Sequence, residues 1–126
     1  MSVHWEGMNE FNKWLSNAGG SVQKAAAAEL YRQGERIMTD SKARYVPVDR
    51  GALRGSGHVK QPHISGSRVE VELGYGGAAK AYALVQHEAM HFQHTVGGPK
   101  YLERPVKAAR RRVSDAVGRA IQKALE

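Results

Sequence analysis

The chain has no cysteine among its 126 residues, and it has few prolines and few aromatic residues. The absence of cysteine excludes a disulfide framework and thiolate metal ligands, and it is compatible with a reducing compartment. The longest apolar runs fall far short of the ~20 residues that a membrane-spanning helix needs. Because the first residues also lack a basic segment followed by an apolar one, we expect a soluble, unexported chain that does not act in a membrane.

The length of the chain limits the number of units that it can contain. At 126 residues it is long enough for one hydrophobic core, and we expect a single domain over residues 1–126. It is short for an enzyme that needs separate substrate and cofactor domains. The sequence therefore favours a small binding or structural domain over a large catalytic one.

The charge of the chain is basic and unevenly distributed. The formal net charge is +7, and residues 100–126 hold eight Lys or Arg residues against three acidic ones. Three of these cations are consecutive, at Arg110, Arg111 and Arg112. Such a segment suits an anionic partner, either nucleic acid or an acidic protein surface, although a solvated helix face has the same composition. The absence of interleaved aromatic residues argues against binding of single-stranded nucleic acid.

Two stretches in the first half of the chain have the apolar spacing of helices. The first covers residues 5–18, and its apolar face is expected to pack on the domain or on a neighbouring subunit; it consists of Trp5, Met8, Phe11, Trp14, Leu15 and Ala18. Ser21 is a candidate N-cap for a second helix that runs to about Arg44. Gly34 lies inside this helix and costs about 1 kcal/mol relative to alanine, so it indicates close packing or a bend.

The middle of the chain has the patterns of strands and loops. Residues 58–64 predict a strand, which Pro62 confines to a sheet edge or a bulge. Residues 68–75 alternate strictly between apolar and charged side chains, which is typical of a half-buried antiparallel strand. Residues 74–80 predict a flexible loop, because their glycine spacing fits neither a P-loop nor a dinucleotide fingerprint.

The last third of the chain completes the predicted fold. The spacing leaves residues 81–93 open between a helix and a further strand, and residues 95–99 predict a loop. From Pro105 to Leu125 the apolar residues keep one stripe, which predicts a C-terminal helix of about 20 residues. Together these elements predict an α+β fold, in which a small antiparallel sheet over residues 58–93 is packed by the two long helices, with an extra N-terminal helix.

A turn over residues 46–56 separates the helical first part from the strands. Pro47 ends any helix that precedes it, and Asp49 can cap the next turn by accepting backbone N–H bonds. Arg50 and Arg54 would share one face of that short turn. This stretch has two interpretations, since it can be a plain connector or part of a family motif.

Four segments of the sequence follow one another in a known order. They are a Pro-Val-Asp-x-Gly-x-Leu-Arg-x-Ser core at residues 47–56, a β segment at residues 69–73, a Tyr-Ala segment at residues 82–88, and a Tyr-Leu-x-x-Pro step within residues 100–106. This order and spacing resemble the bacteriophage tail-component family, the tail-completion proteins at the head–tail junction of long-tailed phages, over residues 22–125. The chain departs from the usual Glu-x-Gly-Thr of that family, with Glu-Ala-Met-His at residues 88–91, and this leaves the local conformation there open.

The resemblance implies a structural protein of the virion that has no substrate and no cofactor. The chain would be a ring-forming subunit at the head–tail junction, made in the host cytoplasm, with other phage connector and tail proteins as partners and possible contact with packaged DNA. The loops at residues 74–80 and 94–99 would reach neighbouring subunits. The residues expected at contacts are Trp14, Asp49, Arg50, Arg54, His94, Arg110, Arg111 and Arg112.

A second class of function comes from a literal His-Glu-x-x-His pattern. In zinc peptidases two histidines on successive helical turns bind the metal and the glutamate activates water, and here the pattern is His87, Glu88 and His91. A third ligand at a recognisable spacing is missing, because His94 would crowd the same helix. The more distant candidates are His58, His63 and Glu103. We therefore expect neither a metal nor catalysis, and regard the histidines as a hydrogen-bonding group that titrates near pH 6.5.

Overall fold

The computed structural model describes residues 20–47, 51–66, 68–76, 81–88, 91–98 and 100–126, without the side chains of residues 91 and 92. The expected N-terminal helix with Trp14, the residues Asp49 and Arg50, and most of the predicted loop at residues 74–80 lie outside these ranges. The described elements follow one another as α2 (Gly20–Asp40), a π-helical turn η1 (Ser41–Tyr45), α3 (Gly51–Gly55), β1 (His58–Val59), β2 (His63–Ser65), β3 (Arg68–Tyr75), β4 (Ala81–Glu88), β5 (His91–Gly97) and α4 (Glu103–Leu125).

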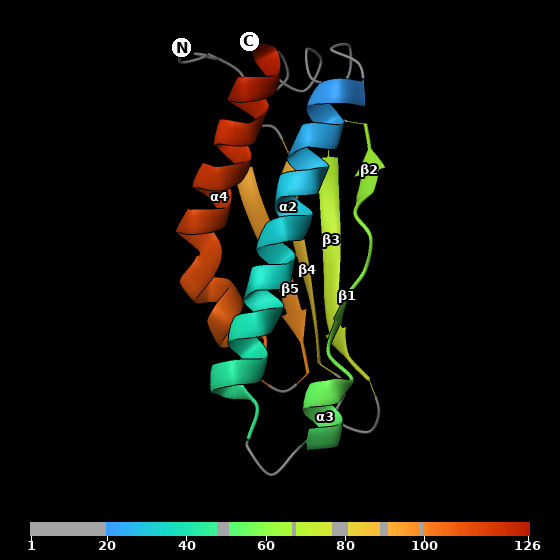
Figure 1. Cartoon of the computed structure of the whole chain (residues 1–126), viewed down its shortest axis with the longest axis vertical. Helices are drawn as coiled ribbons and strands as arrows, with labels where there is room; N and C mark the ends of the chain where they lie inside the picture. Colours follow the sequence, from blue (N-terminus) through green and yellow to red (C-terminus); the bar gives the residue numbers. More distant parts are fainter. Residues whose placement is uncertain (1–19, 48–50, 67, 77–80, 89–90, 99) are drawn as a thin grey trace.

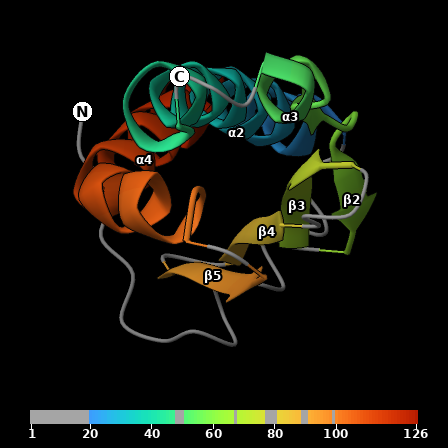
Figure 2. The ribbon, with the colours of Figure 1, turned by 90° about the horizontal axis from the view of Figure 1, so that it is seen from below.

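The two long helices and the sheet form two layers (Figure 1). The sheet is antiparallel, with the strand order β1-β3-β4-β5, and β2 also pairs with β3. Helices α2 and α4 run side by side in opposite directions, and the sheet curves around them so that they cover one of its faces (Figure 2). The predicted α+β class, with a small antiparallel sheet packed by two long helices, is confirmed.

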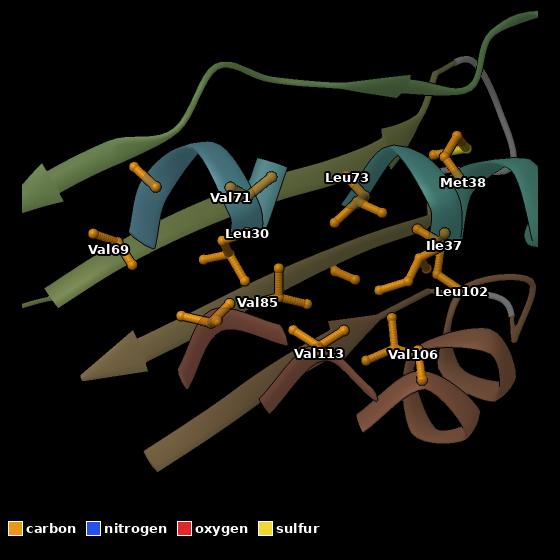
Figure 3. Close-up of a cluster of buried hydrophobic side chains, with 14 of the residues drawn as sticks. Leu30, Ile37, Met38, Val69, Val71, Leu73, Val85, Leu102, Val106 and Val113 are labelled. Carbon is orange, nitrogen blue, oxygen red and sulfur yellow. The ribbon is translucent and has the colours of Figure 1, made fainter. Parts of the chain in front are cut away.

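The hydrophobic core lies between the helix pair and the covered face of the sheet (Figure 3). Every second residue of β3 points into it, as the strict alternation of the sequence predicts. Because side chains buried to this extent each stabilise the fold by roughly 1.5–3 kcal/mol, the core fixes how the two layers meet. Its largest fully buried members are Leu30, Ile37, Val69, Val71, Leu73, Val85, Leu102, Val106, Val113 and Val117.

Helix α2 lies very close to β3 at Gly34. A Cβ at this position would come within 3.2 Å of Val71 Cγ1 and 3.4 Å of Val59 Cγ1, so the glycine permits close packing of the helix on the sheet. The helix passes into the π-helical turn at Ser41 and ends at Tyr45, close to the predicted end at Arg44. Ser21 is not the N-cap, since the helix already includes Gly20.

A β-bulge separates β1 from β2 on the outer edge of the sheet. Lys60 donates its backbone N–H to the carbonyl of Glu72, and His63 lies opposite Glu70. Two residues of the edge strand, Gln61 and Pro62, therefore lie opposite the single residue Val71 of β3. Proline has no N–H for a ladder, and a bulge at an edge is where it can be accommodated. The predicted effect of Pro62 is therefore confirmed, and it also divides the expected strand into two short ones.

Strands β4 and β5 pair antiparallel, which corrects the predicted loop over residues 95–97. Thr95 and Val96 lie opposite Leu84 and Ala83 in the register of β4 and β5, and the strand continues to Gly97. The alternative of a helix over residues 81–93 is also wrong. The burial of β4 alternates with a period of two, because one side of that strand faces the helices and the other faces away from them.

Helix α4 begins directly after a fully buried leucine. Leu102 lies in the core, and its carbonyl accepts the N–H of Val106 over 3.0 Å. Pro105 lies in the first turn, where the missing N–H costs nothing, as predicted. No helix among the described residues is both long and apolar enough to cross a bilayer.

Candidate interaction surfaces

The three consecutive arginines of α4 point in three different directions. Successive residues of a helix are about 100° apart, so a run of three cannot form one patch. Arg110 is exposed next to β5, Arg111 is exposed on the outside of the helix, and Arg112 is partly buried against α2. The sequence suggested one cluster at Arg110–Arg112, and the structure separates it into three environments.

Arg112 joins the two helices through a polar network. Its Nε donates to Gln33 Oε1 over 3.2 Å, and Gln33 Nε2 donates to Glu29 Oε2 over 2.9 Å. Glu29 also receives Arg32 Nη2 over 3.0 Å. Burial acts to raise the pKa of Glu29, but the hydrogen bonds from Gln33 and Arg32 and the positive charges of Arg32 and Arg119 outweigh it and lower that pKa.

The surroundings of the Arg112 guanidinium disfavour its charged form. Burial and the nearby Arg36 lower its pKa, and Asp40 acts in the opposite direction. Its Nη2 is buried and has no hydrogen-bond partner in the described structure. Because a side chain in this position supports the packing of α2 against α4, Arg112 is a poor choice for a substitution that is meant to test the surface alone.

His94 and Arg110 lie together where β5, the last strand of the described sheet, meets α4. They line a hollow of about 340 Å³ with Gln86, Gln93 and Thr95. Burial, Arg110 and Lys107 lower the pKa of His94, while Glu103 acts to raise it. The structure thus brings together two of the predicted contact residues, His94 on strand β5, where the sequence predicted a loop, and Arg110 on helix α4.

Arg54 lies on α3, at the opposite side of the domain from β5. Its Nη2 reaches the carbonyl of Val46 over 3.4 Å, and it lines a shallow hollow of about 420 Å³ with Thr39, Lys42 and Ala43. The predicted partners of Arg54 in the turn, Asp49 and Arg50, lie outside the described residues. The shared arginine face in this turn therefore stays a prediction.

The described residues of the His-Glu-x-x-His pattern, His87, Glu88 and His91, lie on two paired strands and not on the helix that a zinc peptidase site needs. His87 and Glu88 end β4, and the backbone of His91 lies opposite Glu88 at the start of β5. Successive strand residues point to opposite faces, and accordingly His87 is 3% exposed under the helices whereas Glu88 is exposed on the other face.

The more distant candidate ligands are also separated from the motif. His58 and His63 are exposed on the outer edge strands, and Glu103 accepts a hydrogen bond from Lys107 Nζ over 3.1 Å on α4. Among the residues that the structure describes, no three His, Cys, Asp or Glu side chains gather closely enough to hold a metal ion.

Two apolar residues are exposed that the sequence analysis did not select. Ile64 is 38% exposed and Tyr82 is 49% exposed, and no other large hydrophobic residue in the described ranges is exposed to this degree. Ile64 borders a hollow of about 410 Å³ between β2 and α2, whose apolar walls include Ala27, Ala28 and Tyr31. Period-two alternation in β4 could have identified Tyr82, since it places this residue on the face opposite to Ala81 and Ala83.

These two exposed residues belong to different surfaces of the domain. The Ile64 hollow opens between α2 and the edge of the sheet, with Lys24 and Arg32 at its border. Tyr82 lies on the face of the sheet that the helices do not cover, and its ring lies against Gly97 of β5. We refer to the second surface, which Tyr82 and Gly97 form at the end of the β4–β5 ladder, as the Tyr82 face.

Comparison of the chain with family models, with characterised proteins and with solved structures found no match. The resemblance to the phage tail-component family therefore stays a prediction from the motif residues, and the function of the chain has to be argued from its surfaces.

Proposed function

We propose that the chain is a structural subunit of the head–tail junction of a long-tailed phage, where copies assemble head to tail into a ring. It has no substrate and no cofactor, it acts in the virion, and its partners are other copies and the neighbouring connector and tail proteins. The proposal combines the order of the four motif segments with the surfaces of the domain.

The observation that supports ring formation most is the position of the two exposed hydrophobic residues, Ile64 and Tyr82. The Ile64 hollow and the Tyr82 face differ in shape and lie on different surfaces. A contact between unlike patches repeats from copy to copy, and it closes into a ring if the rotation permits. We therefore propose that the Tyr82 face of one copy packs against the Ile64 hollow of the next.

Two single variants and their mixture test this arrangement. Ile64→Asp damages only the hollow and Tyr82→Asp damages only the Tyr82 face, so each variant alone should stop at the monomer. An equimolar mixture retains one intact pair of patches, and we expect it to form dimers and no rings. Light scattering and negative-stain microscopy at high protein concentration measure all three samples, with Ala124→Asp on exposed α4 as the control that still assembles.

The outcomes separate the ring from other arrangements. A two-fold dimer through one patch would be disrupted by one variant only, and the other variant would still form dimers on its own, which the proposed ring does not allow. A wild-type protein that stays monomeric at high concentration, alone and with its connector, would contradict the proposed ring.

A further inference from the structure

The outer side of the helix pair has a concentration of arginines and exposes no large hydrophobic residue among the described residues. Helix α4 exposes the stripe Arg104, Ala108, Arg111, Asp115 and Arg119 at steps of three and four residues. We call the surface made by this stripe and the adjacent α2 residues the arginine face; its exposed cations are Arg32, Arg36, Arg104, Arg111 and Arg119.

Contacts between the helices place the two rows of arginines next to each other. Arg112 donates a hydrogen bond to Gln33 of α2 and is repelled electrostatically by Arg36. Arg119 of α4 interacts electrostatically with Glu29 of α2. Both helices are regular and pack on the sheet along much of their length, so the guanidinium groups project from a rigid support. The arginine rows of α2 and α4 therefore form one continuous basic surface across the two neighbouring helices.

The acidic residues of this surface only partly neutralise it. Glu29 is already engaged by Arg32 and Gln33, and Asp40 acts on the partly buried Arg112. Asp115 is the exposed acid within the stripe. Glu35 is a second exposed acid, on α2 next to Arg36. The five exposed arginines outnumber these two exposed acids, and Arg36 and Arg111 have no ion pair among the described residues.

The composition of the arginine face decides between two anionic partners. Protein interfaces depend on a buried centre of aromatic or large aliphatic side chains, and the two large exposed hydrophobic residues of the described chain, Ile64 and Tyr82, lie elsewhere. Alanines such as Ala108 fill the space between the arginines. A surface of guanidinium groups without an apolar centre suits phosphates, which guanidinium binds in a bidentate manner and which dominate affinity for nucleic acid.

We propose that the arginine face binds the phosphate backbone of duplex DNA without reading its sequence. Double-stranded DNA presents one charge per about 1.7 Å of its axis, so it offers a continuous line of phosphates to two rows of arginines. Single-stranded binding would need aromatic side chains for base stacking, and this face has none in the described structure. The inference goes beyond the proposed ring, because a single copy carries the whole surface.

The salt dependence of binding to a short fluorescein-labelled duplex of mixed sequence tests the inference. Each arginine that contacts a phosphate contributes about one unit to the slope of log K against log salt. We expect Arg36→Gln, Arg111→Gln and Arg119→Gln each to lower that slope by about one, and the triple variant to lower it by about three. Arg112 is left intact because it bonds to Gln33, and Arg32 is left intact because it borders the Ile64 hollow.

Arg68→Gln and Lys60→Gln are the matched controls. Both remove an exposed or half-exposed cation from the sheet side, where each is within salt-bridge distance of a glutamate, and both should leave the slope unchanged. The inference is overturned if the controls lower the slope as much as the arginine variants do. It is also overturned if the wild-type protein binds poly-glutamate as tightly as the duplex, or fails to bind the duplex at low salt.

Measuring at protein concentrations where the chain is monomeric separates this inference from the proposed ring. If the three arginines cause salt-dependent DNA binding and the protein never assembles, the arginine face is supported and the ring is contradicted. Rings that form normally from the triple variant, together with a wild-type protein that ignores DNA, support the ring and contradict the arginine face.

Discussion

The hydroxyls of Ser41 and Tyr75 lie 2.7 Å apart and connect the end of the long helix to the end of the central strand. Ser41 gives its single proton to the carbonyl of Tyr101 over 2.6 Å, so Tyr75 is the donor to Ser41. The rings of Tyr75 and Tyr101 also meet edge to face, with centroids 6.3 Å apart. One serine in the π-helical turn thus holds three segments together.

We expect Ser41→Ala to lower the free energy of unfolding by about 1–3 kcal/mol, because it leaves the buried hydroxyl of Tyr75 and the carbonyl of Tyr101 without this partner. Denaturant unfolding measures the change. Thr39→Ala is the control, since that hydroxyl only donates to a carbonyl in its own exposed helix turn and should matter by less than about 0.5 kcal/mol. Equal effects of the two variants would contradict the role of Ser41.

Gly57 and Gly118 should respond to alanine in opposite directions. A Cβ at Gly57 would lie 2.5 Å from Lys42 Cε and 2.8 Å from both Met38 Sδ and Tyr75 Cε1, so overpacking should cost about 1–3 kcal/mol. A Cβ at Gly118 in α4 would meet open space, and the better helix propensity of alanine should add about 0.5–1 kcal/mol. Thermal unfolding distinguishes the two, and destabilisation by Gly118→Ala would show that this side of α4 is packed.

His94 should make the fold less stable in acid. Burial, together with Arg110 and Lys107, lowers its pKa below the ordinary value of 6.5, so the unfolded chain binds the proton more readily than the folded one does. Stability supplied by neutral His94 is therefore present above pH 6.5 and is lost as the pH falls through the window below it. Urea unfolding above and below this pH should show the loss, and His94→Gln should reduce it; an unchanged pH dependence would contradict this assignment.

We expect the protein, purified without a histidine tag, to contain no stoichiometric zinc and to have no peptidase activity that Glu88→Gln abolishes. The reason is that His87 and Glu88 point to opposite faces of the sheet. Elemental analysis and a casein assay measure the two properties, with His58→Ala as a control for unspecific binding by surface histidines. One zinc per chain that is lost on substitution of His87 or His91 would restore the hydrolase alternative.

The elements that the sequence predicted best are those in which a long regular period agrees with the fold. Residues 68–75 alternate strictly and form β3 over the same range, and the apolar stripe after Pro105 forms the buried side of α4. Pro62 was informative because it cannot donate to a strand ladder, whatever its surroundings are. In each case a local rule and the packing of the domain require the same structure.

The predictions that were wrong concern residues whose structure depends on distant partners. Thr95 and Gly97 resemble a loop in sequence, but pairing with β4 extends them into a strand. The His-Glu-x-x-His pattern was uninformative for the same reason, since five residues cannot specify a helix against a sheet that pairs with them. Exposure of Ile64 depends on where α2 crosses the edge of the sheet, and this crossing is a property of the whole fold.

The order of the strands has a consequence for the folding pathway. Each strand pairs with one that is near it in the chain, whereas Gln33 and Arg112, which join the helices, are 79 residues apart. Short loops cost little entropy to close and long ones cost more, so the hairpins are expected to form before α2 meets α4. Contacts that form late affect mainly the rate of unfolding. Substitutions between the two helices should therefore shorten the lifetime of the folded protein and leave the speed of its folding almost unchanged.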